Sequence, residues 1–576
     1  MGLLSRRTWW RRAALVAATA LALGSLSATG AEAHGGKHPK PSPASVQVRV
    51  ISFNDLHGNL EPPSGSSGRV VLADGTTVDA GGAAYLATHV KQLEAEVKNS
   101  VVVSTGDSIG ASPLASALFH DEPTVEVLNA LGVKAMALGN HELDEGYDEL
   151  LRLQRGGCHP VDGCQFRDTF EGTDFPVLGA NVYLKRSGRP ALLPFRIVRS
   201  GGMPVAIIGA TLKDLPDVVV ADGIKDLRFG DEVSAINRTA KVLDRLGVKS
   251  QVVLVHQGDS PLAGNPPNGC GVTSGPGFTI AKNVSASVDA VFLAHSHQQY
   301  NCVVNDPSGK PRAVIQGLSF GRLLSVVDLQ IDRRTKDVIR SNTIAENEVV
   351  TRTVTPDPAV QAIVDEAKAK AAPLANRQIG TITADLLRAQ APSGESTLGD
   401  VIADAQLAGT RANGAQIAIT NPGGIRADLV YASSPVGEGG GVVTYGEAFT
   451  VQPFGNIMQT VTLTGAQLDA VLEQQWLSGG RTAILQISNG FSYTSSPTDP
   501  IGARVSDLRL DGVPITPTGT YRVSINNFLA GGGDGFSVFA EGTDLAGGPI
   551  DLDALVDYFE ASSPIAPPPL NRITVN

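Results

Sequence analysis

Residues 46–58 read VQVRVISFNDLHG. The stretch from Val46 to Phe53 is rich in β-branched and apolar residues, which is typical of a buried β-strand. Directly after it the sequence turns polar and supplies a carboxylate, Asp55, and an imidazole, His57. A buried strand that ends in such side chains predicts an α/β domain with its functional groups at the carboxyl end of the strand.

The combination of an apolar run and a polar turn recurs along the first half of the chain. Apolar runs cover residues 100–105, 134–138, 204–210, 250–256 and 289–295, and a helix-like stretch covers 83–98. Polar turns after these runs read GDS at 106–108, GNHELD at 139–144, HQGD at 256–259 and HSH at 295–297. Their candidate functional side chains are Asp107, Asn140, His141, Asp144, His256, His295 and His297.

These turns together indicate a metal site. Because parallel strands place their carboxyl ends at one edge of an α/β sheet, we expect the turns to converge there. Mixed carboxylate and imidazole ligands suit zinc, manganese or iron, not calcium or magnesium alone. A single histidine after a strand is more often a hydrogen-bonded core residue, but the ordered set of turns is not explained in that way. One carboxylate shared by two ions would hold them roughly 3.5–4 Å apart, which suits phosphoryl chemistry.

The sequence rhythm changes after residue 354. Residues 355–376 predict a helix, and a second mixed α/β region starts at Gly380. Its turns could hold a nucleotide, because they supply an arginine fork for phosphate and aromatic rings that can stack on a base. The alternative is that Phe454 and Phe528 are core residues. The turns concerned are NPGGIR at 421–426, PFGN at 453–456 and NNFLAGGGDGF at 526–536.

Composition limits the classes to which the chain can belong. Its 576 residues are 18% charged and 42% hydrophobic, which is typical of a globular chain with about two to four domains. The net charge is −11, so the chain lacks the excess of basic residues that binding to a nucleic acid polymer requires. We therefore expect no such polymer as a partner, whereas a nucleotide substrate stays open. The sequence does not indicate an oligomeric state.

The N-terminal residues are typical of an export signal. Arginines precede an apolar run from Ala13 to Leu23, and Ala31-Glu32-Ala33 fits a cleavage site, so residues 1–33 are expected to be removed. The pair Arg6-Arg7 fits a twin-arginine signal as well as an ordinary secretory one. The apolar run is too short to span a bilayer. We therefore expect a secreted protein with no membrane partner.

Four cysteines are an even number, which in an exported chain favours two disulfides. Three pairings are open. Proximity favours Cys158 with Cys164, and Cys270 with Cys302 then follows by elimination. Zinc ligation by these cysteines is disfavoured because paired CxxC motifs are absent from the sequence.

The ordered polar turns resemble the motifs of the calcineurin-like metallophosphoesterase superfamily, and with the C-terminal turns they resemble the 5′-nucleotidase family. This resemblance covers nearly all of the chain after the export signal. It implies an α/β fold in which a four-layer β-sandwich flanked by helices precedes a separate mixed α/β nucleotide-binding domain. The expected boundaries are 1–33 for the signal peptide, 34–45 for a flexible leader, 46–354 for the catalytic domain, 355–376 for a linker helix and 377–576 for the substrate-binding domain.

The resemblance also implies a role for each candidate residue. His141, paired with Asp144, would stabilise the transition state and assist the leaving oxygen. One divalent ion, zinc, manganese or similar, would be held by Asp55, His57, Asp107 and His297, and a second by Asp107, Asn140, His256 and His295. In the second domain, Phe454 and Phe528 would clamp the base, Asn456 would contact it, Asp534 would hold the ribose hydroxyls and Arg426 would meet the phosphate. Two positions depart from the family pattern, since many 5′-nucleotidases carry Gln or Asn at His297 and glycine at Ala294.

The activity implied by the resemblance is release of phosphate from nucleoside 5′-monophosphates, by attack of a metal-activated hydroxide on the phosphate. The same architecture serves 2′,3′-cyclic-nucleotide phosphodiesterases with 3′-nucleotidase activity, UDP-sugar hydrolases and NAD-cleaving enzymes, and the sequence does not choose firmly among them. A non-enzymatic alternative is a secreted metal- or nucleotide-binding protein, which would be expected to have lost ligands piecemeal.

Overall fold

The computed structural model describes residues 44–576 except 64, 263, 434–436 and 477–481. The predicted signal, residues 1–33, and nearly all of the predicted leader lie outside the described residues. Within the described part of the chain, no helix combines the length and apolar character that crossing a membrane requires.

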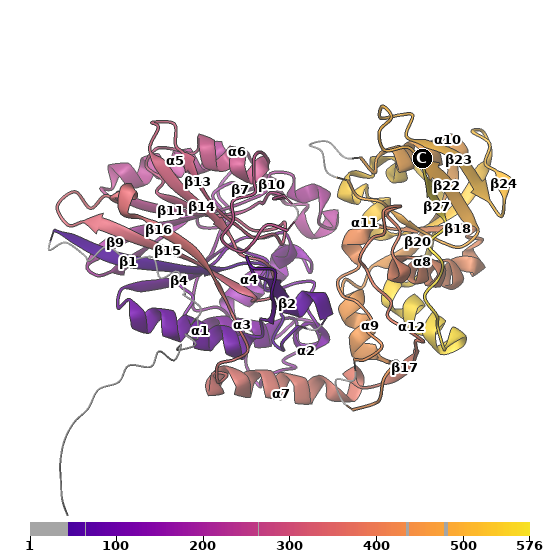
Figure 1. Ribbon diagram of the computed structural model, residues 1–576, viewed down its shortest axis with the longest axis horizontal. Coiled ribbons are helices and arrows are strands. Elements are labelled where there is room, and N and C mark those ends of the chain that lie inside the picture. Colours follow the sequence, from indigo (N-terminus) through magenta and orange to yellow (C-terminus); the bar gives the residue numbers. More distant parts are fainter. Residues whose placement is uncertain (1–43, 64, 263, 434–436, 477–481) are drawn as a thin grey trace, which may run out of the picture. The chain divides into compact units, whose positions relative to one another are not determined.

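Two six-stranded mixed sheets form the first domain (Figure 1). In the first sheet, β1, β4, β5 and β6 are parallel. At the β1 edge, β15 pairs antiparallel with β1, and β16 pairs antiparallel with β15. Its order is β16 (Ile344–Val349), β15 (Leu323–Asp332), β1 (Ser45–Phe53), β4 (Ser100–Ser104), β5 (Ala135–Ala137) and β6 (Val177–Leu178). The order of the second sheet is β13 (Tyr300–Asn305), β14 (Pro311–Gln316), β12 (Ala290–Phe292), β11 (Ser250–His256), β9 (Met203–Thr211) and β8 (Phe195–Ser200).

The two sheets pack face to face between layers of helices. Between them lies an apolar core to which the first sheet contributes Val50 and Val103 and the second contributes Ile207, Leu254 and Phe292. The outer face of the first sheet is covered by α1 (Ala83–Glu96), α3 (Glu122–Ala130) and α7 (Pro358–Ala375), and that of the second by α5 (Glu232–Arg245) and α6 (Pro276–Asn283). Together these elements confirm the predicted four-layer α/β sandwich.

The apolar runs in the sequence predicted the inner strands of both sheets but not all of the flanking strands. The runs at 46–53, 100–105, 134–138, 204–210, 250–256 and 289–295 correspond to β1, β4, β5, β9, β11 and β12. The long strand β15 was not predicted, although it is buried along nearly its whole length and pairs with β1 from Ser45 to Ser52. Helix α7 occupies most of 355–376, and its buried residues, Val360, Val364, Ala367 and Ala371, belong to the core of the first domain.

The second domain is built on a five-stranded mixed sheet, as the predicted mixed α/β pattern requires. The order is β21 (Gln486–Ile487), β18 (Ile417–Thr420), β25 (Thr520–Asn526), β20 (Ile457–Thr464) and β26 (Thr543–Ile550). A smaller sheet contains β24 (Val513–Pro514), β23 (Val505–Leu510), β22 (Phe491–Ser495) and β27 (Ile573–Val575). The helices include α8 (Thr397–Thr410), α9 (Tyr445–Val451), α10 (Gly465–Glu473), α11 (Asn527–Ala530) and α12 (Asp551–Ser562).

Both favoured disulfides are present in the structure. Cys158 is bonded to Cys164, and Cys270 to Cys302. The first closes a short loop after α4 (Tyr147–Arg155), and the second ties the loop before α6 to strand β13.

The core between the sheets should dominate the stability of the first domain. Phe292 is 1% exposed there, so we expect Phe292→Ala to lower the free energy of unfolding by about 3–5 kcal/mol. The matched control is Val303→Ala on the edge strand β13, where the side chain is 70% exposed and the expected change is within about 0.5 kcal/mol. Urea unfolding followed by circular dichroism measures both, and equal effects of the two substitutions would contradict this account of the core.

Candidate metal centre

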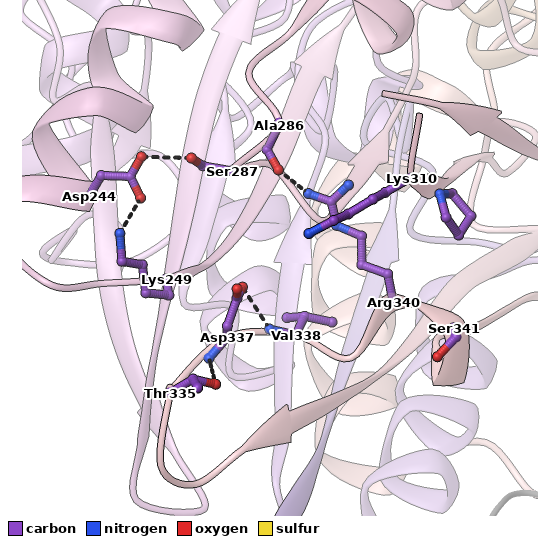
Figure 2. Close-up of a pocket in the computed structure, with 11 residues that line it drawn as sticks. Asp244, Lys249, Ala286, Ser287, Lys310, Thr335, Asp337, Val338, Arg340 and Ser341 are labelled. Atoms are coloured by element: carbon purple, nitrogen blue, oxygen red, sulfur yellow. Dashed lines mark hydrogen bonds and ion pairs between the residues drawn. The ribbon is translucent and has the colours of Figure 1, made fainter. Parts of the chain in front are cut away.

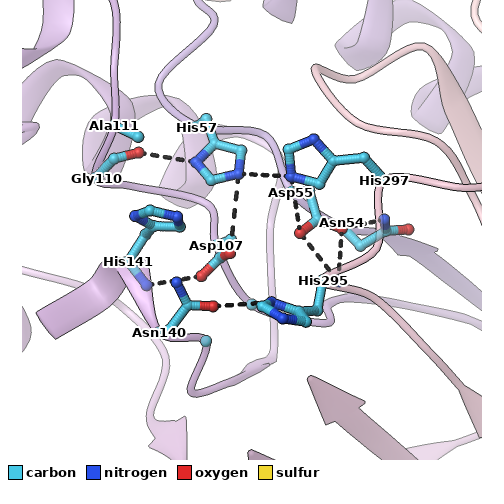
Figure 3. A network of polar contacts seen from close by, with 12 residues as sticks. Asn54, Asp55, His57, Asp107, Gly110, Ala111, Asn140, His141, His295 and His297 are labelled. Carbon is cyan, nitrogen blue, oxygen red and sulfur yellow. Dashed lines mark hydrogen bonds and ion pairs between the residues drawn. The ribbon is translucent and has the colours of Figure 1, made fainter. Parts of the chain in front are cut away.

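Five strand ends, drawn from both sheets, bring the predicted metal ligands together (Figure 3). Strands β1, β4 and β5 of the first sheet and β11 and β12 of the second end at this place. The turns after four of them carry Asp55, His57, Asp107, Asn140, His295 and His297, and His256 is the last residue of β11. Within this set Asp55, His57, Asp107, Asn140 and His256 are almost completely buried, whereas His295 and His297 are half-buried.

One group of ligand atoms is formed by Asp55, His57 and His297. Nε2 of His57 lies 3.0 Å from Nε2 of His297, and Nε2 of His297 lies 3.5 Å from Oδ1 of Asp55. Two imidazole nitrogens that face each other can share only one proton, whereas both can donate a lone pair to a cation beside them. The arrangement therefore suits a metal ion.

A second group is formed by Asp107, His256 and His295. Nε2 of His256 lies 2.9 Å from Oδ2 of Asp107, yet this buried nitrogen makes no hydrogen bond. Nδ1 of His295 lies 3.0 Å from Oδ1 of Asn140. Because Asp107 Oδ2 is also 3.8 Å from Nε2 of His57, Asp107 stands between the two groups.

Backbone carbonyls fix which nitrogen of two histidines faces the site. Nδ1 of His57 donates to the carbonyl of Gly110 at 2.9 Å, and Nδ1 of His256 donates to that of Thr105 at 2.9 Å. The Nε2 lone pairs are therefore left to point at the site, as in known metal-binding histidines. Burial, together with the charge of Arg426, lowers the pKa of His57 well below its usual value, so this ring is neutral and able to ligate.

The charge on Asp107 also suits a shared ligand. Burial raises the pKa of this carboxyl, but the neighbouring His256 and His141 outweigh that effect and hold the pKa well below its usual range. Asp107 is therefore ionised. An ionised carboxylate between two sets of imidazole ligands fits two divalent cations held by oxygen and nitrogen donors.

The turns that carry these ligands have an unusual backbone. Asp55, His57, Asp107, His295 and His297 all have φ between 48° and 68°, the left-handed region that side chains with a Cβ rarely adopt. Each such residue costs on the order of 1–3 kcal/mol and persists only where surrounding contacts enforce it. The enforcing contacts include hydrogen bonds from Asp55 N to Gly106 O and from His57 N to Asp107 O, both 2.9 Å.

Glu142 joins two of the metal turns and was missed by the sequence analysis. Its carboxylate accepts the backbone N–H groups of Asp107 at 2.9 Å, Ser108 at 2.8 Å and Gly139 at 2.6 Å. The turns are packed so closely that a Cβ at Gly139 would lie 2.1 Å from Oδ1 of Asp107. The signal was present in the sequence, since Glu142 is an acidic residue inside GNHELD that lies next to the buried Leu143.

Asn54 was also missed, although it directly precedes Asp55. Its amide Nδ2 lies 2.5 Å from Asp55 Oδ2, 2.5 Å from the carbonyl of Gly317 and 2.6 Å from that of Leu318. Asn54 therefore orients the carboxylate of Asp55.

His141 and Asp144 lie beside the first group of ligands. Nδ1 of His141 is 3.0 Å from both carboxylate oxygens of Asp144, and the ring centroid of His141 is 4.9 Å from that of His57. Burial lowers the pKa of His141, but the charges of Asp144 and Asp107 outweigh it and raise the pKa above its usual value. A ring with this raised pKa, held by one carboxylate, can donate a proton near the metal ligands.

All described residues belong to one compact unit. Within it, two of the predicted nucleotide-binding residues, Arg426 and Phe454, contact residues of the metal centre. Nη2 of Arg426 lies 3.4 Å from Nε2 of His57. The ring of Phe454 stacks on His141 at 5.6 Å with an interplanar angle of 24°, and the Arg426 guanidinium lies 5.6 Å from the same phenyl ring.

The other predicted substrate residues have partners within the second domain. Asn456 donates to Asp551 at 3.0 Å, and Asp534 accepts from Asn421 at 2.7 Å, a polar contact that the sequence analysis missed. Phe528 lies against Gly533, where a Cβ would come within 2.6 Å of its ring. Within the described residues, Phe454 and Phe528 make no ring contact with each other.

A separate cavity of about 600 Å³ lies in the first domain, and none of its lining residues is a predicted metal ligand (Figure 2). Two of its basic groups are paired: Lys249 lies 3.0 Å from Asp244, and Arg340 lies 3.0 Å from Asp289 and 2.6 Å from Asp306. Since its lining holds no histidine, the cavity offers no donor set like that of the metal centre.

Comparisons with known proteins agree with this geometry. The family described as calcineurin-like phosphoesterase matches residues 48–299, and the family described as the 5′-nucleotidase C-terminal domain matches residues 378–541. A solved structure of a 5′-nucleotidase precursor from Thermus thermophilus is 26% identical and superposes with a TM-score of 0.75, covering 92% of this chain and 99% of its own.

Two curated relatives align with most of the chain. The snake venom 5′-nucleotidase of Naja atra is 27% identical over 91% of this chain and 97% of its own length. Endonuclease YhcR of Bacillus subtilis is 33% identical over 94% of this chain, but the chain spans only 42% of the length of that relative.

If Glu142 joins the two turns, Glu142→Gln should weaken metal binding. The amide has a single acceptor oxygen for three N–H donors and places its own NH₂ against them. We expect an affinity for Mn²⁺ or Zn²⁺ that is about 10–100-fold lower, measured by titration calorimetry. The control is Glu94→Gln at an exposed site on α1. An unchanged affinity for Glu142→Gln would show that this carboxylate does not position the ligands.

Proposed function

The chain belongs to the 5′-nucleotidase family of calcineurin-like metallophosphoesterases, and from that premise we propose that it releases phosphate from nucleoside 5′-monophosphates. Enzymes of this kind are metal-dependent hydrolases. The observation that carries the proposal is the placement of two groups of potential metal ligands, with Asp107 of the second group 3.8 Å from His57 of the first, next to the His141–Asp144 pair and Arg426.

In the proposed site the first ion is held by Asp55, His57, Asp107 and His297, and the second by Asp107, Asn140, His256 and His295. Two groups of potential ligand atoms, each within 4.8 Å, support this assignment. When bound, two divalent ions would activate water and neutralise the phosphate oxygens. Zinc and manganese both suit the mixed oxygen and nitrogen donors.

The chain's own groups have three tasks in this reaction. Arg426 binds the phosphate, because its guanidinium lies at the metal centre and offers parallel N–H donors. Protonated His141 donates a hydrogen bond, and then a proton, to the nucleoside oxygen as it leaves. Asp144 holds the ring of His141 through Nδ1, which keeps Nε2 as the atom that faces the substrate.

The second domain recognises the nucleoside in this proposal. Phe454 and Phe528 provide aromatic faces for the base, Asn456 contacts its edge and Asp534 accepts hydrogen bonds from the ribose hydroxyls. The position of Phe454 beside His141 supports a base-binding surface close to the reacting phosphate. Stacking of a base on one such ring contributes roughly 1–3 kcal/mol.

Other phosphate esters of nucleosides would fit the same groups. A 2′,3′-cyclic nucleotide, a 3′-monophosphate, a UDP-sugar or NAD also presents a base beside a phosphate, so these form the second set of candidate substrates. Nucleic acid polymers are disfavoured by the net charge of −11. The relative named as an endonuclease is much longer than this chain, and its name describes that protein.

The proposed location is outside the cell. Two disulfides support an oxidising compartment, and the arginines and apolar run of residues 1–33 support export through a cleaved signal. The domain boundaries that accompany this proposal are 46–354 for catalysis, 355–376 for the connecting helix and 377–576 for substrate binding.

The substrate assignment is tested by phosphate release from 5′-AMP, 3′-AMP, 2′,3′-cyclic AMP, UDP-glucose and NAD, each with Mn²⁺ or Zn²⁺. We expect the highest kcat/KM with 5′-AMP and loss of activity with a chelator, because the bound ions would activate the attacking water. A preference for the cyclic diester or for a dinucleotide would keep the metal mechanism and overturn the 5′-monophosphate assignment. No hydrolysis of any of them would overturn the proposed activity.

The role of His141 is tested through its carboxylate partner. In Asp144→Asn the negative charge that raises the pKa of His141 is removed, so the pKa should fall. A proton donor with a lower pKa loses its proton earlier as the pH rises. We therefore expect the alkaline decline of kcat to begin at lower pH in this variant, while KM changes little.

Two further variants serve as a loss-of-donor comparison and as a control for the pH profile. His141→Ala removes the donor and should lower kcat by about 10²–10⁴-fold with metal content unchanged. Asp148→Asn, an exposed carboxylate on α4, should leave the pH profile as it is. An Asp144→Asn profile that matched the wild type would argue against His141 as the proton donor.

A further inference from the structure

A second cluster of histidines and carboxylates shares no residue with the metal centre. His120, Glu145 and His159 each offer a ligand atom, and these atoms all lie within 4.8 Å of one another. Asp162 lies beside them, with Oδ2 at 2.9 Å from Nε2 of His120 and 3.2 Å from Nδ1 of His159. The residues come from the turn before α3, from the turn before α4 and from the loop after α4.

The charges in this cluster are not balanced without a cation. The rings of His120 and His159 are stacked at 3.8 Å with an interplanar angle of 16°, so two protonated rings would repel each other at short distance. Two neutral rings would leave the carboxylates of Glu145 and Asp162 without a positive partner in the cluster, and a single protonated ring at His120 leaves one negative charge in excess. A divalent cation satisfies both requirements, because it needs neutral imidazoles and balances two carboxylates.

We propose that His120, Glu145 and His159 bind a zinc-like divalent ion at a structural site separate from the catalytic metal centre. The donor set of two imidazoles and one carboxylate is typical of zinc, with a water molecule to complete the coordination. Water can reach the position, since His120 and His159 are 17% and 16% exposed and Glu145 is 48% exposed.

The orientation of His120 fits a metal ligand with a supporting partner. Nδ1 of His120 faces Glu145 at 2.8 Å, and its Nε2 faces Asp162 at 2.9 Å. With Nδ1 bound to the ion, the N–H on the opposite side of the ring donates to Asp162. A carboxylate on the second ring nitrogen is the usual support for a metal-binding histidine, since it fixes both the tautomer and the ring orientation.

The loop that carries His159 and Asp162 is already ordered. A disulfide joins Cys158 to Cys164, and inside it the N–H of Gly163 donates to the carbonyl of His159 at 2.9 Å. The backbone N–H of Asp162 also lies 3.2 Å from Nδ1 of His159. Because this closed loop holds the two side chains in place, little conformational entropy is lost when an ion binds.

A proton is the competitor for this site. The hydrogen bond to Glu145 raises the pKa of His120 to about 9, and burial only partly offsets that effect. In the absence of metal, His120 is therefore an imidazolium between two carboxylates. The ion replaces one of its protons and leaves the hydrogen bond to Asp162 in place.

Two of the proposed ligands adjoin residues that shape the catalytic site. Glu145 follows Asp144, which holds His141 and also accepts the backbone N–H of Ala111 at 3.0 Å. His120 precedes Asp121, which accepts the N–H of Gly110 at 2.9 Å. An ion bound by Glu145 and His120 would therefore stiffen both turns from outside.

The test uses the chain without an affinity tag, in a background that removes ligands from both catalytic groups, His57→Ala with Asp107→Asn and His256→Ala. We expect this background still to bind zinc in a calorimetric titration and to give a cobalt absorption spectrum typical of tetrahedral coordination. Adding His159→Ala or Glu145→Gln should weaken the remaining binding by at least 10-fold and remove the cobalt bands. Because the background lacks ligands from both catalytic groups and the readout is metal binding, the result does not depend on the proposed nucleotidase activity.

The matched control adds His89→Ala, which removes a histidine whose Nε2 is bonded to the carbonyl of Thr351 outside either cluster. It should leave zinc binding unchanged, and circular dichroism of each variant establishes that the chain is folded. A folded background that binds no zinc, or zinc binding that survives both His159→Ala and Glu145→Gln, would overturn the proposal and leave the cluster as an ion-paired surface loop.

Discussion

The metal centre depends on a contact between the ends of two different sheets. The carboxylate of Asp55, which follows β1 of the first sheet, accepts the backbone N–H of His295, which follows β12 of the second, at 3.1 Å. Neither sheet alone carries a complete set of ligands. The apolar core between the sheets therefore has a functional consequence, because it sets the distance at which Asp55 and Asp107 meet His256 and His295. A shift of one sheet against the other would separate the two groups of ligand atoms.

The conformational strain of the site lies in the backbone of the turns that carry the ligands. Five metal-site residues adopt left-handed φ values, and the strain is held by short hydrogen bonds between neighbouring turns and by the buried carboxylate of Glu142. Left-handed φ values also occur beside the ligands, at His120 and Asp121. The carboxylate of Asp121 accepts the backbone N–H of Gly110, and the carbonyl of Gly110 accepts a hydrogen bond from His57. The ligands, the residues that support them and the proposed outer metal cluster thus form one connected set of turns.

The sequence allowed much of this arrangement to be predicted, because the inner parallel strands are continuous apolar runs and each ends in a short polar motif. It could not predict β15, since a long buried strand at the end of a domain has no functional motif to mark it, and its place beside β1 follows from pairing across the whole domain. Glu142 and Asn54 were missed for a different reason. They act on backbone groups of other turns, and only three-dimensional structure reveals which N–H or carbonyl lies within reach. The contact of Phe454 with His141 was equally beyond the sequence, because it joins residues more than three hundred positions apart.

The candidate metal ligands and the candidate substrate residues are divided between the two domains in a way that the composition already suggests. All ten histidines precede Gly380, and every candidate metal ligand belongs to the first domain, whereas the second supplies an arginine, aromatic rings and polar side chains. Of the predicted substrate residues, Arg426 and Phe454 reach the metal centre, while Asn456 and Asp534 are bonded to Asp551 and Asn421 of their own domain. Under the proposed function, the choice among phosphate esters therefore rests on the second domain. Substitutions there would then change which nucleotide is cleaved, whereas substitutions in the turns of the first domain would change whether any is cleaved at all.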